Sequence, residues 1–115
     1  MTEPAAHAAP LRVVLMTAPD AEIAASVARA LVDERLIVCA NVLPGVTSIY
    51  RWQGAVHADA EVLVVMKTRE ALVPRLVERA AELHPYEVPE LLALPVMDGL
   101  PAYCRWVMDE TAQGG

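Results

Sequence analysis

The sequence has no run of 18 apolar residues, and its nine basic residues are scattered singly along the chain. The first absence leaves no candidate for a membrane-spanning helix. The second argues against nucleic acid and anionic membranes as partners, because both are bound through clusters of lysine and arginine. The formal net charge of −6 is compatible with cations near the surface, but acidity alone does not predict a metal site.

The spacings typical of common enzymes and zinc sites are also missing. The five glycines are isolated and form no phosphate-binding loop. The two cysteines, Cys39 and Cys104, are not part of a C-x-x-C pair, and no H-x₃-H spacing occurs. No set of nucleophile, base and acid is visible. We therefore expect a protein that is not an enzyme, with two free thiols that fit the cytoplasm.

The sequence predicts one domain with a short tail at each end. Residues 1–10 have neither the positive start nor the apolar stretch of a signal peptide. We expect disordered tails over 1–10 and 113–115, a single domain over 11–112, and a cytoplasmic location.

The chain is apolar for its length. Its hydrophobic fraction is 56% and its mean hydropathy +0.36, against a usual fraction of about 45–50%. Such a surplus suggests apolar surface that is buried against another subunit. The alternative is a core built from many small residues, since much of the excess is alanine.

The hydrophobic pattern predicts the order β-α-β-β-α-β followed by a terminal helix. Asp20 or Thr17 would cap the first helix. Pro74 should kink or delay the second helix, and Pro95 should mark an edge or a bulge. The expected strands are 11–16, 36–52, 55–68 and 91–96, and the expected helices are 21–34, 69–83 and 100–111.

This order is that of a ferredoxin-like α+β sandwich. Right-handed crossovers place the first two helices on one face of a four-stranded antiparallel sheet. The other face would be apolar and uncovered. Strand 36–43 is apolar on both sides, so we expect it to be covered on both.

The two middle strands form a long hairpin. Gln53-Gly54 fits a two-residue turn, which places Tyr50 opposite His57 and Ser48 opposite Asp59. Seventeen extended residues span roughly 55 Å, whereas a compact domain of this size is roughly 35 Å across. Either Pro44-Gly45 bends the hairpin back, or its tip, with Tyr50 and Trp52, reaches a neighbouring subunit.

Titratable side chains and rigid backbone coincide in one segment, His84-Pro85-Tyr86-Glu87-Val88-Pro89-Glu90. His84 either bonds backbone carbonyls at the end of the second helix or binds a ligand or metal. Cys39 reads as a buried inert thiol or as a soft ligand. Lys67 lies in an apolar strand, which fits either an edge strand or the binding of an anion or acidic side chain, with Glu90 as the candidate partner.

Three segments together closely resemble the CutA divalent-cation tolerance protein family: Cys39 to Gly54, Glu61 to Thr68, and His84 to Glu90. Thr17-Ala18-Pro19-Asp20 and the terminal Tyr103 and Trp106 also match. The resemblance spans about residues 11–110. It implies a tight homotrimer similar in architecture to the PII signalling proteins, a cytoplasmic location, and an association with copper tolerance in which some members bind copper or other divalent ions.

The resemblance makes His84 the first candidate metal ligand, with Cys39 and Met16 as soft partners. Met16 stands where some copper-binding members have a cysteine, and Leu83 where they double the histidine. A thioether can still bind Cu(I). The expected cation is copper or another divalent ion, and none is required for folding.

Two other functions stay open. One is a PII-like trimer that binds a small anion or a partner protein between subunits, with Lys67, Tyr86, Glu90 and Trp52 lining the cleft. The other is a purely structural trimer. In each, we expect the subunit interface to use Tyr50, Trp52, Pro85 and Pro89.

Overall fold

The computed structural model describes residues 10–111, so the tails predicted over 1–10 and 113–115 lie outside that range except for Pro10. The Pro10 carbonyl accepts a hydrogen bond from the Glu70 N–H. The elements in chain order are β1 (Leu11–Ala18), α2 (Ala21–Asp33), β2 (Cys39–Trp52), β3 (Ala55–Arg69), the 3₁₀ turn η1 (Glu70–Leu72), α3 (Val73–Leu83), β4 (Leu91–Pro95) and α4 (Pro101–Glu110).

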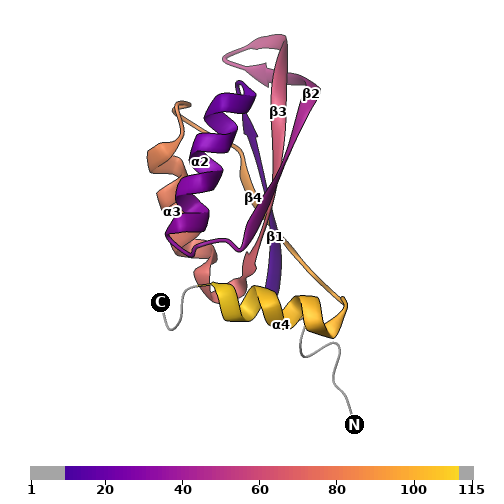
Figure 1. Cartoon of the computed structure of the whole chain (residues 1–115). Helices are drawn as coiled ribbons and strands as arrows, with labels where there is room; N and C mark the ends of the chain where they lie inside the picture. Colours follow the sequence, from indigo (N-terminus) through magenta and orange to yellow (C-terminus); the bar gives the residue numbers. More distant parts are fainter. Residues whose placement is uncertain (1–9, 112–115) are drawn as a thin grey trace.

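The four strands form one antiparallel sheet in the order β2-β3-β1-β4 (Figure 1). This is the predicted ferredoxin-like α+β arrangement. Because β3 lies between β2 and β1, Lys67 is in an interior strand, and the edge-strand explanation for it was wrong. Pro95 ends β4, which is an edge strand as predicted.

Local sequence explains where both layer helices begin. Asp20 caps α2, accepting a hydrogen bond from the Ile23 N–H at 2.8 Å. Pro74 delays α3, as predicted: the chain first makes the short turn η1, and the proline then occupies the first turn of the helix, where no N–H is needed.

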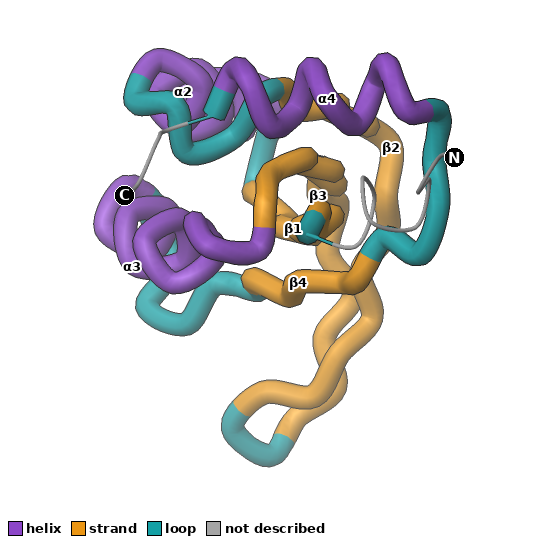
Figure 2. Tube along the Cα trace, turned by 90° about the horizontal axis from the view of Figure 1, so that it is seen from below, coloured by secondary structure: helices purple, strands orange, loops and turns teal. Residues whose placement is uncertain are grey.

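The main core lies between the sheet and the α2–α3 layer. Alternate residues of the central strands, such as Val14, Met16, Val64 and Met66, are fully buried there against Leu31 and Leu76 of the two helices. Figure 2 shows α2 and α3 side by side and α4 running across as a separate element.

The opposite sheet face is only partly open, which corrects the expectation that nothing covers it. Helix α4 packs Cys104 and Val107 over Leu11 at one end, with Val38, Val96 and Met108 around them. Beyond α4, Leu92 and Leu94 of β4 are about half exposed. An apolar strip of sheet therefore remains uncovered by the rest of residues 10–111.

Strand β2 begins later than predicted and is less buried. Leu36 and Ile37 are buried, but they lie in the turn before the strand, which starts at Cys39. Leu43 is 42% exposed. The prediction that this segment is covered on both sides was wrong, because β2 is an edge strand with one open face.

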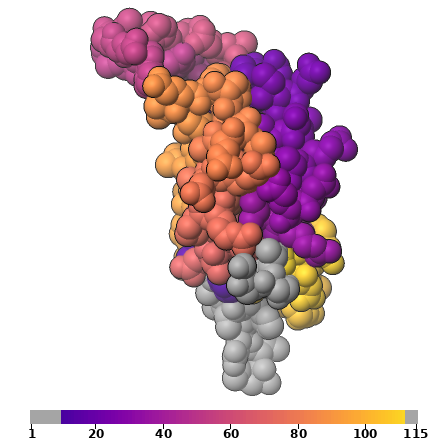
Figure 3. All heavy atoms as spheres, turned by 90° about the vertical axis from the view of Figure 1, so that its left-hand side faces the viewer, coloured from indigo at the N-terminus to yellow at the C-terminus, as the bar shows by residue number. Residues whose placement is uncertain are grey.

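The hairpin projects from the body (Figures 1 and 3). Gln53 and Gly54 both have positive φ (51° and 82°), as a tight two-residue turn requires. The register places Tyr50 opposite His57 and Ser48 opposite Asp59, as predicted. The molecule measures 54 × 24 × 22 Å, with a radius of gyration of 15.1 Å, against about 13 Å for a compact domain. The bulge at Pro44-Gly45 does not fold the hairpin back.

Candidate functional site

The His84 side chain links the end of α3 to the end of β1 through a hydrogen bond. It is 7% exposed. Its Nε2 lies 2.7 Å from the Thr17 carbonyl oxygen, and its Nδ1 accepts the Tyr86 N–H at 3.1 Å. Because a carbonyl only accepts, the proton must be on Nε2. Both ring nitrogens are therefore engaged in hydrogen bonds to backbone groups. One of the two predicted alternatives was a bond to backbone carbonyls at the end of α3. The carbonyl that His84 bonds belongs instead to Thr17 in β1.

Tyr86 connects the segment 84–90 to the hairpin. Its ring packs on His84 with centroids 4.7 Å apart, and its hydroxyl donates to Glu61 Oε2 at 2.6 Å. Two residues earlier in β3, Asp59 accepts a hydrogen bond from the Tyr50 hydroxyl at 2.5 Å. We call these four residues, Tyr50, Asp59, Glu61 and Tyr86, the tyrosine–carboxylate cluster.

The cluster holds its tyrosines in the neutral form. Partial burial and the hydrogen bond to Glu61 raise the pKa of Tyr86 well above its usual range. The hydrogen bond to Asp59 raises the pKa of Tyr50. In both cases a phenolate would lose its bond and face a carboxylate. The hydrogen bonds of the cluster thus connect the segment 84–90 to the hairpin.

Lys67 has a different partner from the one predicted. Its ammonium donates to the Asn41 side-chain oxygen on β2. Glu90 is exposed just before β4, whose first residue Leu91 pairs with Met16, whereas Lys67 pairs with Val13. Three residues along β1 separate those positions, or roughly 10 Å. Glu90 therefore does not pair with Lys67 within one chain.

Cys39 lies directly across from Lys67 on the partly open sheet face, and its thiol is 3.7 Å from the Tyr103 hydroxyl of α4. The thiol is half-buried rather than fully buried. Burial and the contact with Cys39 raise the pKa of Tyr103 to about 12. Cys104, in contrast, is buried in the α4 cluster.

The three candidate metal ligands do not converge within one chain. Met16 is completely buried in the core between sheet and helices, Cys39 lies on the opposite sheet face, and His84 uses both ring nitrogens. Among residues 10–111 no group of three or more His, Cys, Asp or Glu side chains is placed to hold a metal ion. The described residues of one chain therefore do not form a preformed copper site.

The residues predicted to line an anion cleft between subunits are well separated within one chain. Trp52 is at the hairpin tip opposite Ala55, and Lys67 is twelve residues further along β3, or roughly 40 Å of strand. Tyr86 contacts Glu61, between these two points. Trp52 and Lys67 can meet only if they come from different subunits.

The four residues expected at an interface are at least partly accessible. Tyr50 and Trp52 are 42% and 43% exposed, Pro85 is exposed, and Pro89 is half-buried. Their role at an interface stays a prediction.

Sequence reasoning missed Asn41, Glu61 and Asp59 as partners of Lys67, Tyr86 and Tyr50. Strand parity already places Asp59 and Glu61 on one face, and the hairpin register places both near Tyr50. The contact with Tyr86 had no sequence signal, because it depends on where the segment after α3 crosses the hairpin.

The fold and the cluster define a ferredoxin-like α+β subunit with a projecting hairpin braced by the segment 84–90. Residues 12–110 match the family model described as CutA1 divalent ion tolerance protein. The chain belongs to this family.

Curated relatives and solved structures agree with this assignment. The chain is 50% identical to the divalent-cation tolerance protein CutA of Thermus thermophilus over 99 residues, covering 86% of this chain and 96% of the relative. It is 47% identical to protein CutA of Mus musculus, covering 84% of this chain but about half, 54%, of that longer relative. The structure of CutA1 from Oryza sativa superposes with a TM-score of 0.89 at 38% identity, covering 94% of this chain and 99% of that one.

Proposed function

We propose that this protein acts in divalent-cation tolerance, with copper as the expected cation, as a non-enzymatic cytoplasmic homotrimer. Membership of the CutA1 family carries the proposal. The relatives are named for cation tolerance and not for a reaction. No helix within residues 10–111 combines the length and apolarity needed to cross a membrane.

Three features of the subunit support assembly. An apolar strip of the sheet stays uncovered beside α4, with Leu92 and Leu94 about half exposed. The hairpin extends the molecule to 54 Å and carries exposed apolar side chains, including Ile49 and Val56. Strands β2 and β4 each leave one edge unpaired within the described residues. A neighbouring copy would cover the apolar strip and the apolar hairpin side chains, and it would pair with the open strand edges.

Because no ligand set is preformed among residues 10–111, a metal ion would bind only after the subunits assemble or the side chains rearrange. Cys39 requires the least change, since its thiol is half-buried on the partly open face and thiolate suits Cu(I). His84 would have to give up the Tyr86 N–H to offer Nδ1. Met16 would have to leave the core.

Calorimetric titration with Cu(I), Cu(II) and Zn(II) tests the metal-binding part. We expect Cu(I) binding that weakens at least tenfold in Cys39→Ser. Cys104→Ala is the control, because it removes the other thiol, which is buried in the α4 cluster with Leu11 and Val107. Loss of binding only in Cys104→Ala, or no binding of any of the three ions, would contradict it.

A growth test addresses tolerance itself. A strain that lacks the gene should be more sensitive to added copper, and the intact chain should restore growth. Equal growth of the two strains over the full range of copper would contradict the proposal. The alternative of a PII-like anion sensor is not favoured, because the family model and the curated relatives are named for divalent-cation tolerance.

A further inference from the structure

The only lysine of the sequence, Lys67, stands directly opposite one of the two cysteines, Cys39. Residues that are directly opposite in an antiparallel pair have Cβ atoms about 4.5–5.5 Å apart. Both side chains are half-buried on the partly open sheet face. A nucleophilic amine and a nucleophilic thiol therefore lie side by side between β2 and β3.

The Lys67 amine can reach the Cys39 thiol without leaving the sheet face. It donates to the Asn41 side-chain oxygen, and Asn41 lies two residues beyond Cys39 on the same face of β2. Rotation about the flexible lysine stem carries the amine from one neighbour to the other. A single hydrogen bond at a partly exposed site does not prevent this exchange.

The surroundings of Cys39 suit a reaction of its thiolate. A thiolate is the form of cysteine that attacks an oxidant, and a neighbouring positive charge stabilises it. Lys67 supplies that charge, and the Tyr103 hydroxyl lies 3.7 Å from the sulfur. Burial and the contact with Cys39 raise the pKa of Tyr103 to about 12, so the hydroxyl keeps its proton at neutral pH and can donate it in a hydrogen bond.

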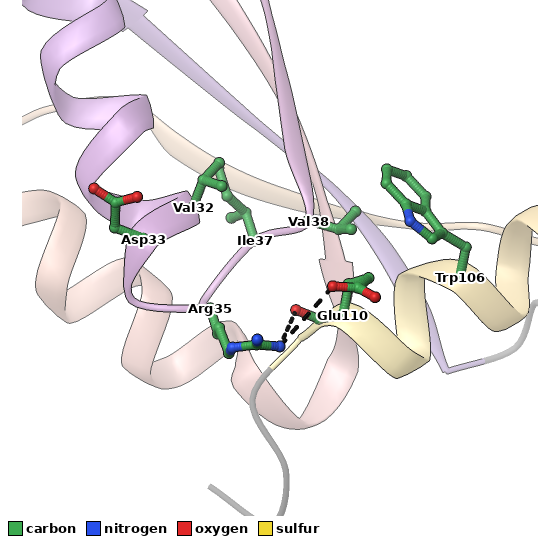
Figure 4. A pocket seen from close by; sticks show the side chains of 7 residues that line it. All are labelled: Val32, Asp33, Arg35, Ile37, Val38, Trp106 and Glu110. Carbon is green, nitrogen blue, oxygen red and sulfur yellow. Dashed lines mark hydrogen bonds and ion pairs between the residues drawn. The ribbon is translucent and has the colours of Figure 1, made fainter.

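A hollow beside this end of β2 leaves room for a small oxidant to approach. Figure 4 shows Val38, the neighbour of Cys39, facing the same hollow as Trp106 of α4. Arg35 and Glu110 close its lower end, with Arg35 Nη1 3.4 Å from the Glu110 carbonyl oxygen. The volume of about 260 Å³ is that of roughly nine water molecules, and hydrogen peroxide is little larger than water.

We propose that hydrogen peroxide converts this pair into a sulfenamide link between Cys39 and Lys67. The Cys39 thiolate attacks one peroxide oxygen and the O–O bond breaks, which gives a sulfenic acid and hydroxide. Sulfur loses two electrons in this step, and peroxide gains them. The Lys67 nitrogen, after releasing one proton to solvent, then attacks the sulfur. The S–O bond breaks, and the hydroxyl leaves as water with a second proton from the nitrogen.

Small thiols reverse the link. One thiol attacks the sulfur and the S–N bond breaks, so that the amine takes up a proton and Cys39 is left in a mixed disulfide. A second thiol then releases Cys39 and forms the disulfide of the reductant. While it persists, the link fastens the edge strand β2 to the interior strand β3 and occupies the Cys39 thiol. It does not depend on the proposed metal chemistry, because neither step uses a metal.

Peptide mapping of the purified native chain tests the proposal. The chain is treated with hydrogen peroxide in the presence of a metal chelator, so that failure here is distinguishable from failure to bind copper. We expect each chain to lose about 2 Da, the two hydrogens that sulfenamide formation removes, and dithiothreitol to restore them. Trypsin should release residues 36–51, with Cys39, joined to residues 52–69, with Lys67, because a modified lysine is not cleaved.

The same map distinguishes the link from disulfides, which also remove two hydrogens. A disulfide with Cys104 would join residues 36–51 to residues 80–105, and a disulfide between two copies of Cys39 would join 36–51 to itself. Either of these as the main product, or a sulfenic acid that dimedone traps without any joining of 36–51 to 52–69, would overturn the proposal. So would a Cys39 that does not react with peroxide.

A second pair of variants tests the position of the amine. Lys67→Arg keeps the positive charge but removes the amine, so we expect a dimedone-reactive sulfenic acid at Cys39 and no loss of 2 Da. Lys67→Arg combined with Arg75→Lys is the matched control, because it restores one lysine on the exposed surface of α3. A link of Cys39 to residue 75 in the same yield as to Lys67 in the native chain would mean that the cross-strand pairing does not direct the reaction.

Discussion

The Tyr86 hydroxyl donates to Glu61 Oε2 at 2.6 Å, and this single contact connects the proline-rich segment after α3 to the base of the hairpin. The two residues are 25 positions apart. Because Glu61 directly precedes the last paired residue of the β1–β3 ladder, Val62, we expect this contact to help set the direction in which the hairpin leaves the body. An altered hairpin direction would alter any assembly that uses the hairpin.

The first prediction is a coupling energy for this pair. Tyr86→Phe and Glu61→Gln should each lower the unfolding free energy by about 1 kcal/mol, since a hydrogen bond to a charged group at a partly exposed site is worth that much. The double variant should cost little more than either single one. Denaturant unfolding at a fixed protein concentration measures all four proteins. Fully additive effects would mean that the two side chains do not interact.

The second prediction concerns alkaline pH. The pKa values of Tyr50, Tyr86 and Tyr103 are all raised in the folded chain. Unfolded tyrosines ionise near pH 10, so between about pH 10 and 12 the folded state binds more protons and stability falls as pH rises. Absorbance at the phenolate band should show no titration below pH 10 in the folded protein. A tyrosine that ionises below its usual pKa would contradict the cluster.

The third prediction separates the two bonds of His84. His84→Ala should destabilise by about 2–3 kcal/mol, because it strands the Thr17 carbonyl and the Tyr86 N–H. His84→Gln can still donate to Thr17 and should cost about half as much. Thermal and denaturant unfolding give both values. Equal losses would mean that the Thr17 contact contributes nothing.

The fourth prediction tests the backbone of the turn at Arg35. Arg35→Gly should be more stable than Arg35→Ala by about 0.5–1 kcal/mol. Glycine adopts the positive φ of this position without strain, and this gain exceeds the extra conformational entropy that glycine loses on folding. Comparing these two variants cancels the loss of the Glu110 contact. Arg35→Ala of equal or greater stability would exclude strain at this position.

Local signals predicted the element order well. Asp20 begins α2, Pro74 delays α3, and Gln53-Gly54 sets the hairpin turn, because each acts through its own backbone. The bulge at Pro44-Gly45 shifted the register by one residue and brought Cys39 opposite Lys67. Sequence indicated an interruption there but not its size.

Contacts that depend on tertiary placement were not predictable in this way. Helix α4 has an apolar side, but its pattern does not say which sheet face it covers, so its packing over Leu11 came only from the structure. The same holds for the two hydrogen bonds of His84, since Thr17 is 67 residues away. The contacts of the candidate site were therefore less predictable than the fold, because they join residues that are far apart in the sequence.

We propose that the protein is a homotrimer whose subunits hold no preformed metal site among residues 10–111. Native mass spectrometry of the purified chain, with and without Cu(I), Cu(II) or Zn(II), measures both the assembly and the bound metal. We expect a trimer without added metal, and copper bound only in the assembled species. A monomer, or a monomer that binds copper stoichiometrically, would contradict it.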